Sequence, residues 1–332
     1  MQKIRIAVLG TGGTIAGEAA SAAEVLHYQD SQLSAAATLA PLARHLPPHI
    51  ELFPVQISQL GSENFSTLTW LSLAEAMTGI HASHDIDGFV LTQGTDTLEE
   101  TAYFLHLALK LSKPVVVVGA MRPATALSAD GPLNLLRAVQ LAASRVVQGF
   151  GVMVVANERI FAAREVTKSH TSSIDSFCSP DFGCIGYMQN GEVKLHRLPS
   201  RQHTLNSPFE VAGLHDLPRV DIVYAYAGAG SESIQAFVAG GACGLVHAGT
   251  GNGSVSSIHQ AAYREVMRQG VAVVRSSRTG SGLVSRNGAV DDDVFGSISA
   301  DTLSPQKARV LLCLALTVTQ DTGELQRFFD AY

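Results

Sequence analysis

The alternation of short apolar segments with amphipathic ones is the feature that most restricts the fold of this chain. Four short segments rich in β-branched and other apolar side chains have the pattern of strands buried on both faces: residues 4–9, 88–92, 114–119 and 151–156. Between them, three segments carry apolar side chains at helical spacing: residues 68–80, 98–111 and 132–144. Strands that alternate with helices predict a parallel sheet covered by helices on both faces.

The alternation stops once and then resumes. Residues 198–219 are mostly polar, contain three prolines and show no sustained period, which is typical of a linker. Beyond them, three expected strands alternate with three expected helices: residues 221–226, 233–239, 244–248, 257–269, 271–275 and 305–319. We therefore predict an α/β protein of two domains. A larger N-terminal domain, residues 1–197, has a mostly parallel sheet flanked by helices, and a smaller C-terminal α/β domain spans residues 220–332.

Local signals predict where three of these helices begin. Thr97 is expected to cap the helix over 98–111, with Glu99 and Glu100 in its first turn, where they suit the helix dipole. Pro132 suits a first helical position. Ser304 is expected to cap the last predicted helix.

Composition excludes two classes of partner. The 332 residues carry a formal net charge of −6 without a run of basic side chains, so a nucleic-acid surface is not expected. No apolar segment approaches the roughly 18 residues of a membrane span. The apolar run in MQKIRIAVLG is shorter than the about 7–15 residues of a secretory signal core, so we interpret it as the first strand. This interpretation predicts a cytoplasmic protein; a periplasmic location stays open if a signal peptide has been removed.

The chain has four cysteines: Cys178, Cys184, Cys243 and Cys313. No two of them form a CxxC motif, so the sequence gives no support for a zinc or thioredoxin-like site. Cys178 and Cys184 are close enough in sequence to form a disulfide. Free thiols in a reducing compartment are the simpler interpretation.

A glycine-rich loop, VLGTGGTIAGE (8–18), follows the first predicted strand, where open parallel sheets bind their ligands. A dinucleotide-binding fingerprint fails because its third glycine would fall on Ile15, and a P-loop fails because Glu18 stands where lysine is required. The glycines instead permit close approach of the backbone around a reactive side chain. Thr14 is the candidate, although it could also simply cap the next turn.

A second Gly-Thr turn follows another predicted strand, in GFVLTQGTDTLEETAYF (88–104). The two strand ends therefore present Gly13-Thr14 and Gly94-Thr95. A threonine hydroxyl needs a neighbouring base to act as a nucleophile. Asp96 is adjacent, and Lys168 could serve if partial desolvation keeps it neutral, although a lone loop lysine is usually an ordinary solvated side chain.

Six longer motifs carry a family resemblance: LGTGGTIAG (9–17), TQGTDTLEETAYF (92–104), VGAMRPATALSADGPLNL (118–135), VTKS (166–169), HAGTGNGSVSS (247–257) and SPQKARVLLCLALT (304–317). In their order and over nearly the whole chain, they resemble the bacterial-type L-asparaginases, in particular the branch of periplasmic-type enzymes and glutaminase-asparaginases. The resemblance implies a homotetramer, a dimer of tight dimers, with each active site between the N-terminal domain of one subunit and the C-terminal domain of its neighbour. It also implies hydrolysis of L-asparagine to L-aspartate and ammonia, with L-glutamine as a further substrate and with no cofactor or metal.

The resemblance also assigns roles to individual residues. Thr14 matches the primary nucleophile and Tyr28 the tyrosine that helps to activate it, while Lys168 supports Thr95 in a second triad with Asp96. Substrate-binding positions fall on Ser62, Glu63, Gly94, Thr95, Asp96 and Asn252, of which Asn252 comes from the neighbouring subunit. Residues 16–40, which are small and polar, match a mobile lid over the nucleophile.

Two positions depart from the family pattern. Gln93 replaces a histidine beside the site, and Ala289 stands where the family has a glutamate that contacts the tyrosine and the substrate ammonium. Unless Asp291 or another neighbour compensates, we expect weaker substrate affinity or broader specificity. The Ser62-Glu63 pair resembles that of the glutaminase-asparaginases, and the one methylene that separates the two substrates is worth only about 1–3 kcal/mol in a pocket. We therefore expect measurable glutamine hydrolysis.

One alternative function remains open at this stage. An amino-acid-binding protein on the same scaffold, with little or no turnover, would fit the loss of the glutamate at Ala289. The presence of Thr14, Thr95, Asp96 and Lys168 together favours the hydrolase.

Overall fold

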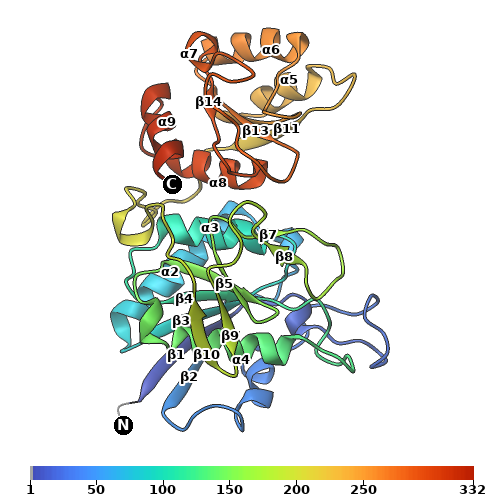
Figure 1. Cartoon of the computed structure of the whole chain (residues 1–332), viewed down its shortest axis with the longest axis vertical. Helices are drawn as coiled ribbons and strands as arrows, with labels where there is room; N and C mark the ends of the chain where they lie inside the picture. The colour runs from blue at the N-terminus through green and yellow to red at the C-terminus, as the bar shows by residue number, and fades with distance from the viewer. Residues whose placement is uncertain (1–2) are drawn as a thin grey trace. The chain divides into compact units, whose positions relative to one another are not determined.

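The computed structural model describes residues 3–332, which divide into two compact units between Ser207 and Pro208 (Figure 1). The division falls inside residues 198–219, the predicted linker. The N-terminal unit contains an eight-stranded sheet and the C-terminal unit a four-stranded one, which confirms the predicted α/β class. None of the helices in the described residues has both the length and the apolar character needed to cross a bilayer.

The sheet of the N-terminal unit has a parallel centre. In spatial order its strands are β10 (Glu192–Leu195), β9 (Gly186–Gln189), β6 (Arg159–Ala162), β5 (Val152–Ala156), β4 (Val115–Val118), β3 (Gly88–Thr92), β1 (Ile4–Gly10) and β2 (Ile50–Gln56). The five strands from β5 to β2 are parallel, and β6, β9 and β10 continue the sheet antiparallel. Because β1 and β3 are adjacent and parallel, the loops that follow them leave the same edge of the sheet.

The strands at the two edges of this sheet are not predicted from the sequence. Strand β2 contains Pro54, which argues against a central strand but is tolerated here because β2 is the edge strand, whose outer N–H groups need no partner. Strands β9 and β10 alternate exposed with more buried residues, a weaker signal than a continuous apolar run.

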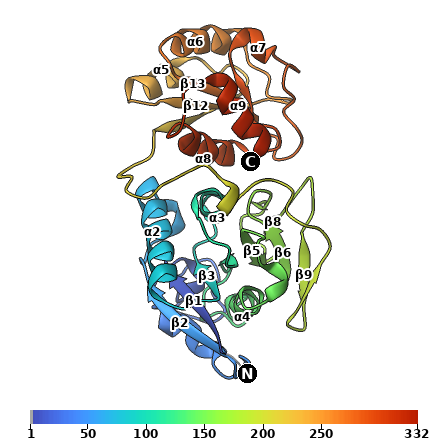
Figure 2. The ribbon, with the colours of Figure 1, turned by 90° about the vertical axis from the view of Figure 1, so that its left-hand side faces the viewer.

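Helices cover both faces of the sheet (Figure 2). The face helices are α2 (Thr67–Ser83), α3 (Leu98–Ala108) and α4 (Gly131–Ala142), preceded along the chain by the short α1 (Ala35–Leu39). Helix α4 packs its buried residues against Val116 and Val118, whose side chains alternate along β4 with those that point to the other face. Helices α2 and α3 pack against each other, with Trp70 stacked on Phe104 and its indole N–H donating to Thr101 over 3.0 Å.

The C-terminal unit has a parallel sheet of four strands: β11 (Val220–Tyr224), β12 (Gly244–Gly249), β13 (Ala272–Ser277) and β14 (Ile298–Ser299). Its helices are α5 (Glu232–Ala239), α6 (Ser257–Arg268), α7 (Asp292–Phe295), α8 (Pro305–Ala315) and α9 (Thr322–Ala331). The predicted helix over 305–319 ends four residues early, and α9 is a separate helix that the sequence analysis did not identify.

Two predicted caps are wrong in their hydrogen bonding. Thr97 does occupy the N-cap of α3, but its hydroxyl donates to the carbonyl oxygen of Ser62 over 2.7 Å instead of accepting from the helix. Ser304 precedes α8, yet its buried hydroxyl has no hydrogen-bond partner among the described residues. Pro132 lies in the first turn of α4, at its second position and not the predicted first, because the helix begins at Gly131.

Candidate active site

Two Gly-Thr turns meet at the carboxyl edge of the N-terminal sheet. Thr11 donates from both its backbone N–H (3.1 Å) and its hydroxyl (2.7 Å) to the carbonyl oxygen of Thr92, which ties the loop after β1 to the loop after β3. Gly13 has a φ of +80°, and a β-carbon there would lie 2.3 Å from the backbone of Gly94. Only glycine allows this approach, so the glycines bring two threonines together.

Thr14 opens a single 3-10 turn (Thr14–Ala16) directly after this contact. Its hydroxyl is hydrogen-bonded to the Tyr28 hydroxyl over 2.7 Å, which confirms that the two side chains lie together as the sequence analysis expected. The Tyr28 ring lies against Gly17, and a pair of backbone hydrogen bonds between Glu18 and Gln29 closes the intervening loop. The loop is therefore anchored at its base beside Thr14. The last residues of the lid predicted over 16–40 include helix α1, whose first side chain, Ala35, is buried.

The second threonine has a cationic partner. Lys168 Nζ donates to Thr95 Oγ1 over 2.8 Å and forms an ion pair with Asp96 Oδ1 at 2.6 Å. Lys168 comes from the short strand β7 (Thr167–Lys168), and its side chain is only 16% exposed, so it is not the ordinary solvated lysine that was the alternative. Thr95 is itself buried.

Glu99 fixes the backbone of that lysine. Its carboxylate is buried and accepts a hydrogen bond from the Lys168 N–H over 2.7 Å. The sequence alone predicts that Glu99 lies in the first turn of α3, where it suits the helix dipole. That place is correct, but the side chain also connects α3 to β7, which no local pattern reveals.

Ser62 and Glu63 occupy a single 3-10 turn (Ser62–Asn64) on the other side of the second threonine turn. Ser62 is buried, and its hydroxyl accepts from the Asp96 N–H over 3.1 Å. Glu63 is exposed at the rim, where one carboxylate oxygen accepts from the Asn64 side chain over 2.8 Å.

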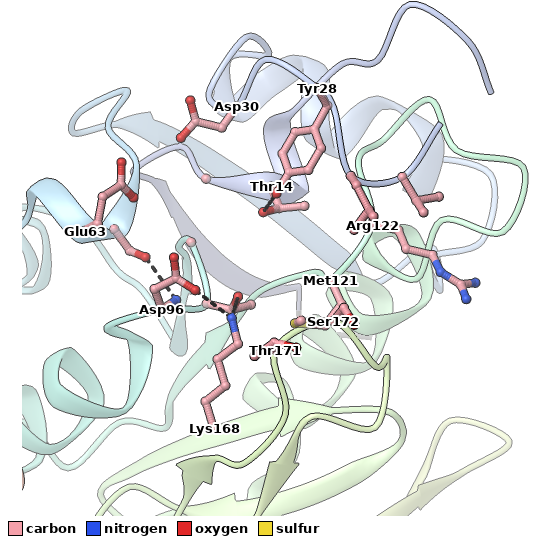
Figure 3. A pocket seen from close by; sticks show the side chains of 16 residues that line it. Thr14, Tyr28, Asp30, Glu63, Asp96, Met121, Arg122, Lys168, Thr171 and Ser172 are labelled. Carbon is pink, nitrogen blue, oxygen red and sulfur yellow. Dashed lines mark hydrogen bonds and ion pairs between the residues drawn. The ribbon is translucent and has the colours of Figure 1, made fainter. Parts of the chain in front are cut away.

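These side chains surround a pocket of about 660 Å³ in the N-terminal unit (Figure 3). This volume is typical of small-molecule sites. The lining residues are Gly13, Thr14, Val25, Leu26, Tyr28, Asp30, Ser62, Glu63, Gly94, Thr95, Asp96, Met121, Arg122, Lys168, Thr171 and Ser172. The structure thus brings together eight of the nine predicted site residues. Asp30, Met121, Arg122, Thr171 and Ser172 were not predicted as site residues, although Met121 and Arg122 lie within the motif over 118–135.

Gln93 does not line the pocket. It is fully buried, its amide nitrogen donates to Thr101 over 3.0 Å, and its amide oxygen has no hydrogen-bond partner among the described residues. Gln93 is therefore a supporting residue below the turn.

Asn252, the ninth predicted residue, belongs to the C-terminal unit and is exposed. Its side chain is held by Ser285, which donates its N–H to Asn252 Oδ1 over 2.8 Å. Ala289 is also exposed in this unit, and Asp291 accepts from the Val294 N–H as the cap of α7.

Two buried groups support the loop that carries Asn252. Arg275 donates to the carbonyl oxygens of Asn252 (3.3 Å) and Gly253 (3.1 Å) while it is ion-paired with Asp292. His247 contacts the carbonyl oxygen of Ser254 through Nε2 at 3.0 Å. Burial lowers the pKa of His247 to about 4, so the ring is neutral at pH 7.

The four cysteines are all free, so Cys178 and Cys184 do not form a disulfide. Within residues 3–332, no group of three or more His, Cys, Asp or Glu side chains has an arrangement that could hold a metal ion.

Comparisons with known proteins agree with this geometry. Residues 5–201 match the family model "Asparaginase, N-terminal", and residues 219–329 match "Glutaminase/Asparaginase C-terminal domain". The chain is 45% identical to a "Probable L-asparaginase periplasmic" of Haemophilus influenzae, over 98% of this chain and 93% of that protein. It is 42% identical to a "Glutaminase-asparaginase" of Pseudomonas fluorescens biotype A, over 98% of this chain and 90% of that protein.

A solved structure is also similar. The crystal structure of a "Probable Cytoplasmic L-asparaginase" from Campylobacter jejuni superposes with a TM-score of 0.95 at 44% identity, covering 99% of this chain and all of that one. With both family models matched in order along nearly the whole length, this chain belongs to the asparaginase family.

Proposed function

We propose that this protein is an amidohydrolase that converts L-asparagine to L-aspartate and ammonia, and that it also hydrolyses L-glutamine. The observation that carries the proposal is that one pocket contains two threonine hydroxyls, each hydrogen-bonded to a side chain that can exchange protons with it. Thr14 is bonded to Tyr28, and Thr95 is bonded to Lys168. Relatives named for asparagine and glutamine hydrolysis support the same substrates.

Thr14 is the proposed nucleophile. Its Oγ1 attacks the side-chain amide carbon while its proton passes to the Tyr28 oxygen and Tyr28 gives up its own hydroxyl proton, which reaches the amide nitrogen, so that the tetrahedral intermediate expels ammonia. Water hydrolyses the resulting ester and restores the Thr14 hydroxyl. Backbone N–H groups of the two Gly-Thr turns are candidates to stabilise the oxyanion. The Gly13 N–H is not one of them, because it already donates to Ser31 Oγ over 2.8 Å.

Thr95 and Lys168 are proposed to move protons on the opposite side of the pocket. The hydrogen bond from Lys168 Nζ to Thr95 gives that hydroxyl a donor and, when the lysine is neutral, a base. The ion pair with Asp96 holds the lysine nitrogen beside the Thr95 hydroxyl. A ligand ammonium bound to Asp96 would weaken this ion pair and so promote transfer of the lysine proton.

A zwitterionic substrate needs complementary groups at its α-carbon. We propose that Asp96 and Glu63 bind the ammonium and that Ser62 and the backbone at Gly94 bind the carboxylate. All four residues border the pocket. The pocket does not include Asn252, which we propose is contributed by the C-terminal unit of a neighbouring subunit in a homotetramer. Its exposure and its fixed side chain are compatible with that role.

We also propose a cytoplasmic location, which four free cysteines favour because oxidising compartments promote disulfides. The similar proteins do not decide the compartment, since one is named periplasmic and another cytoplasmic. Fractionation of the source cells, with an activity assay on each fraction, tests the location.

The proposed reaction is tested by ammonia release from L-asparagine and L-glutamine, measured in parallel on the wild type and two variants. Thr14→Ala should lower kcat by about 10³-fold or more, because the attacking oxygen is lost. Thr14→Ser keeps that oxygen and should retain a measurable part of the activity. Ligand binding without ammonia release from the wild type would instead support the amino-acid-binding alternative.

A further inference from the structure

Asp30 lines the pocket although no motif marks it. It lies two residues beyond Tyr28, in the loop that follows the first Gly-Thr turn. In Figure 3 its carboxylate lies above that of Glu63, on the side of the pocket away from Arg122. Asp30 is partly buried, and no described residue forms a hydrogen bond or ion pair with its carboxylate.

The carboxylates of Asp30 and Glu63 converge beside Gly61. A β-carbon placed on Gly61 would lie 2.3 Å from Glu63 Oε1 and 2.7 Å from Asp30 Oδ2. Two oxygens this close to one point can both be reached by a single ammonium nitrogen, since N–H···O distances are about 2.9 Å. The backbone of Gly61 has an ordinary extended conformation that any residue can adopt. A glycine is therefore needed here because a side chain would collide with the two carboxylates.

Neither cation that lines the pocket neutralises this pair. Lys168 is bound to Asp96 and Thr95, and Arg122 donates through Nη1 to Ser128, at 3.0 Å to its carbonyl oxygen and 2.5 Å to its hydroxyl. Two facing carboxylates without a cation repel each other, and a bound cation removes the repulsion. An ammonium group carries both the positive charge and the N–H donors that two neighbouring carboxylates accept.

We propose that Asp30 is a substrate-binding residue that holds the α-ammonium group of the amino acid together with Glu63. The proposal rests on the proposed function, because it takes the ligand of this pocket to be a zwitterionic amino acid. Asp96 shares its carboxylate with Lys168, so Asp30 adds a further, unpaired carboxylate to the ammonium site that Asp96 and Glu63 form. The pocket then selects amino acids over otherwise similar acids that lack the amino group.

The test compares two ligands that differ only in this group. L-Aspartate carries the ammonium, and succinate has the same two carboxylates without it. Their dissociation constants are measured by titration calorimetry on the wild type, on Asp30→Asn and on Glu24→Gln. Asp30→Asn keeps the shape of the side chain and removes its charge. Glu24→Gln removes a charge from the same loop at a residue that does not line the pocket.

Asp30→Asn should weaken L-aspartate binding about tenfold, as expected for the loss of one charged hydrogen bond, and should leave succinate binding unchanged or tighter. Glu24→Gln should change neither. Equal weakening of both ligands in Asp30→Asn, no change in either, or no preference of the wild type for L-aspartate over succinate would overturn the proposal.

This readout is separate from the proposed function, because calorimetry requires no turnover. If the wild type binds L-aspartate in an Asp30-dependent way but releases no ammonia, the ammonium site stands and the hydrolase proposal fails. If ammonia is released and Asp30→Asn binds both ligands normally, the reverse holds.

Discussion

The buried ion pair between Arg275 and Asp292 predicts a large loss of stability in the variant Asp292→Asn. Neither side chain is exposed to solvent, and the contact is bidentate, with Nε–Oδ1 at 2.6 Å and Nη2–Oδ2 at 2.5 Å. Asparagine keeps the shape but not the charge of aspartate, so the variant leaves a guanidinium buried without its counter-ion. Removing one partner of a buried pair typically costs about 3–5 kcal/mol.

The lower half of that range is expected here. Arg275 keeps its hydrogen bonds to the carbonyl oxygens of Asn252, Gly253 and Ser285, which partly solvate the charge. Asp292 additionally accepts from the N–H of Asn287 over 2.8 Å, a contact that the asparagine oxygen can retain. We therefore expect about 3 kcal/mol, a large fraction of the 5–15 kcal/mol typical of a folded domain.

The assay is urea unfolding of the wild type, Asp292→Asn and the double variant Arg275→Met/Asp292→Leu. The double variant removes both charges and should be more stable than Asp292→Asn, because replacing a whole buried pair is often nearly neutral. A loss below about 1 kcal/mol in Asp292→Asn, or a double variant less stable than the single one, would refute the reasoning.

The stability that the Asp292 carboxylate contributes should also depend on pH. Burial of the Asp292 carboxyl alone would raise its pKa, but hydrogen bonds from Arg275, Ser297 and Asn287 outweigh burial, so its pKa lies below the usual value. A carboxyl with a lowered pKa contributes stability above its unfolded pKa of about 3.9 and loses it as the pH falls through the folded value. The stability gap between wild type and Asp292→Asn should therefore be constant near neutral pH and shrink below about pH 4.

Two further predictions concern the contribution of the C-terminal unit. Ala289→Glu should lower KM for L-asparagine if this position faces the substrate ammonium of a neighbouring subunit. The decrease in KM should be larger when Asp30→Asn is also present. Steady-state kinetics that show an unchanged KM both with and without Asp30→Asn would contradict this prediction. Co-refolding the inactive variant Thr14→Ala with an inactive Asn252→Ala should restore part of the ammonia release. In a mixed oligomer, some active sites take their Thr14 from one variant and their Asn252 from the other, so both residues are intact. An inactive mixture that sedimentation shows to contain mixed oligomers would contradict shared sites.

The parts of the fold that local pattern predicts are those in which one physical cause dominates. Residues 88–92 form a strand buried at every position, so their continuous apolar run is unambiguous. The edge strand over 50–56 has a mixed burial pattern and a proline, so its pairing depends on a neighbour that the local sequence does not reveal. The cap predicted at Thr97 is wrong for a related reason. The Thr97 hydroxyl could hydrogen-bond either to the first turn of the helix or to a distant carbonyl oxygen, and in the folded chain it donates to that of Ser62.

The same limit separates Glu99 and Asp30 from the residues that the motifs identified. Thr14 and Thr95 follow strands in glycine-rich turns, a context that is itself unusual, and the close approach of Gly13 to Gly94 explains why those glycines are needed. Glu99 and Asp30 are single carboxylates in unremarkable contexts, one in the first turn of a helix and one in a polar loop. Their difference arises only when the chain folds. Glu99 then meets a backbone N–H in the interior, whereas Asp30 lies close to a second carboxylate beside Gly61, with no cation of the described residues to neutralise the pair. A buried acid that is hydrogen-bonded serves the structure that holds Lys168 in place, and an unpaired one beside a like charge favours a cationic ligand.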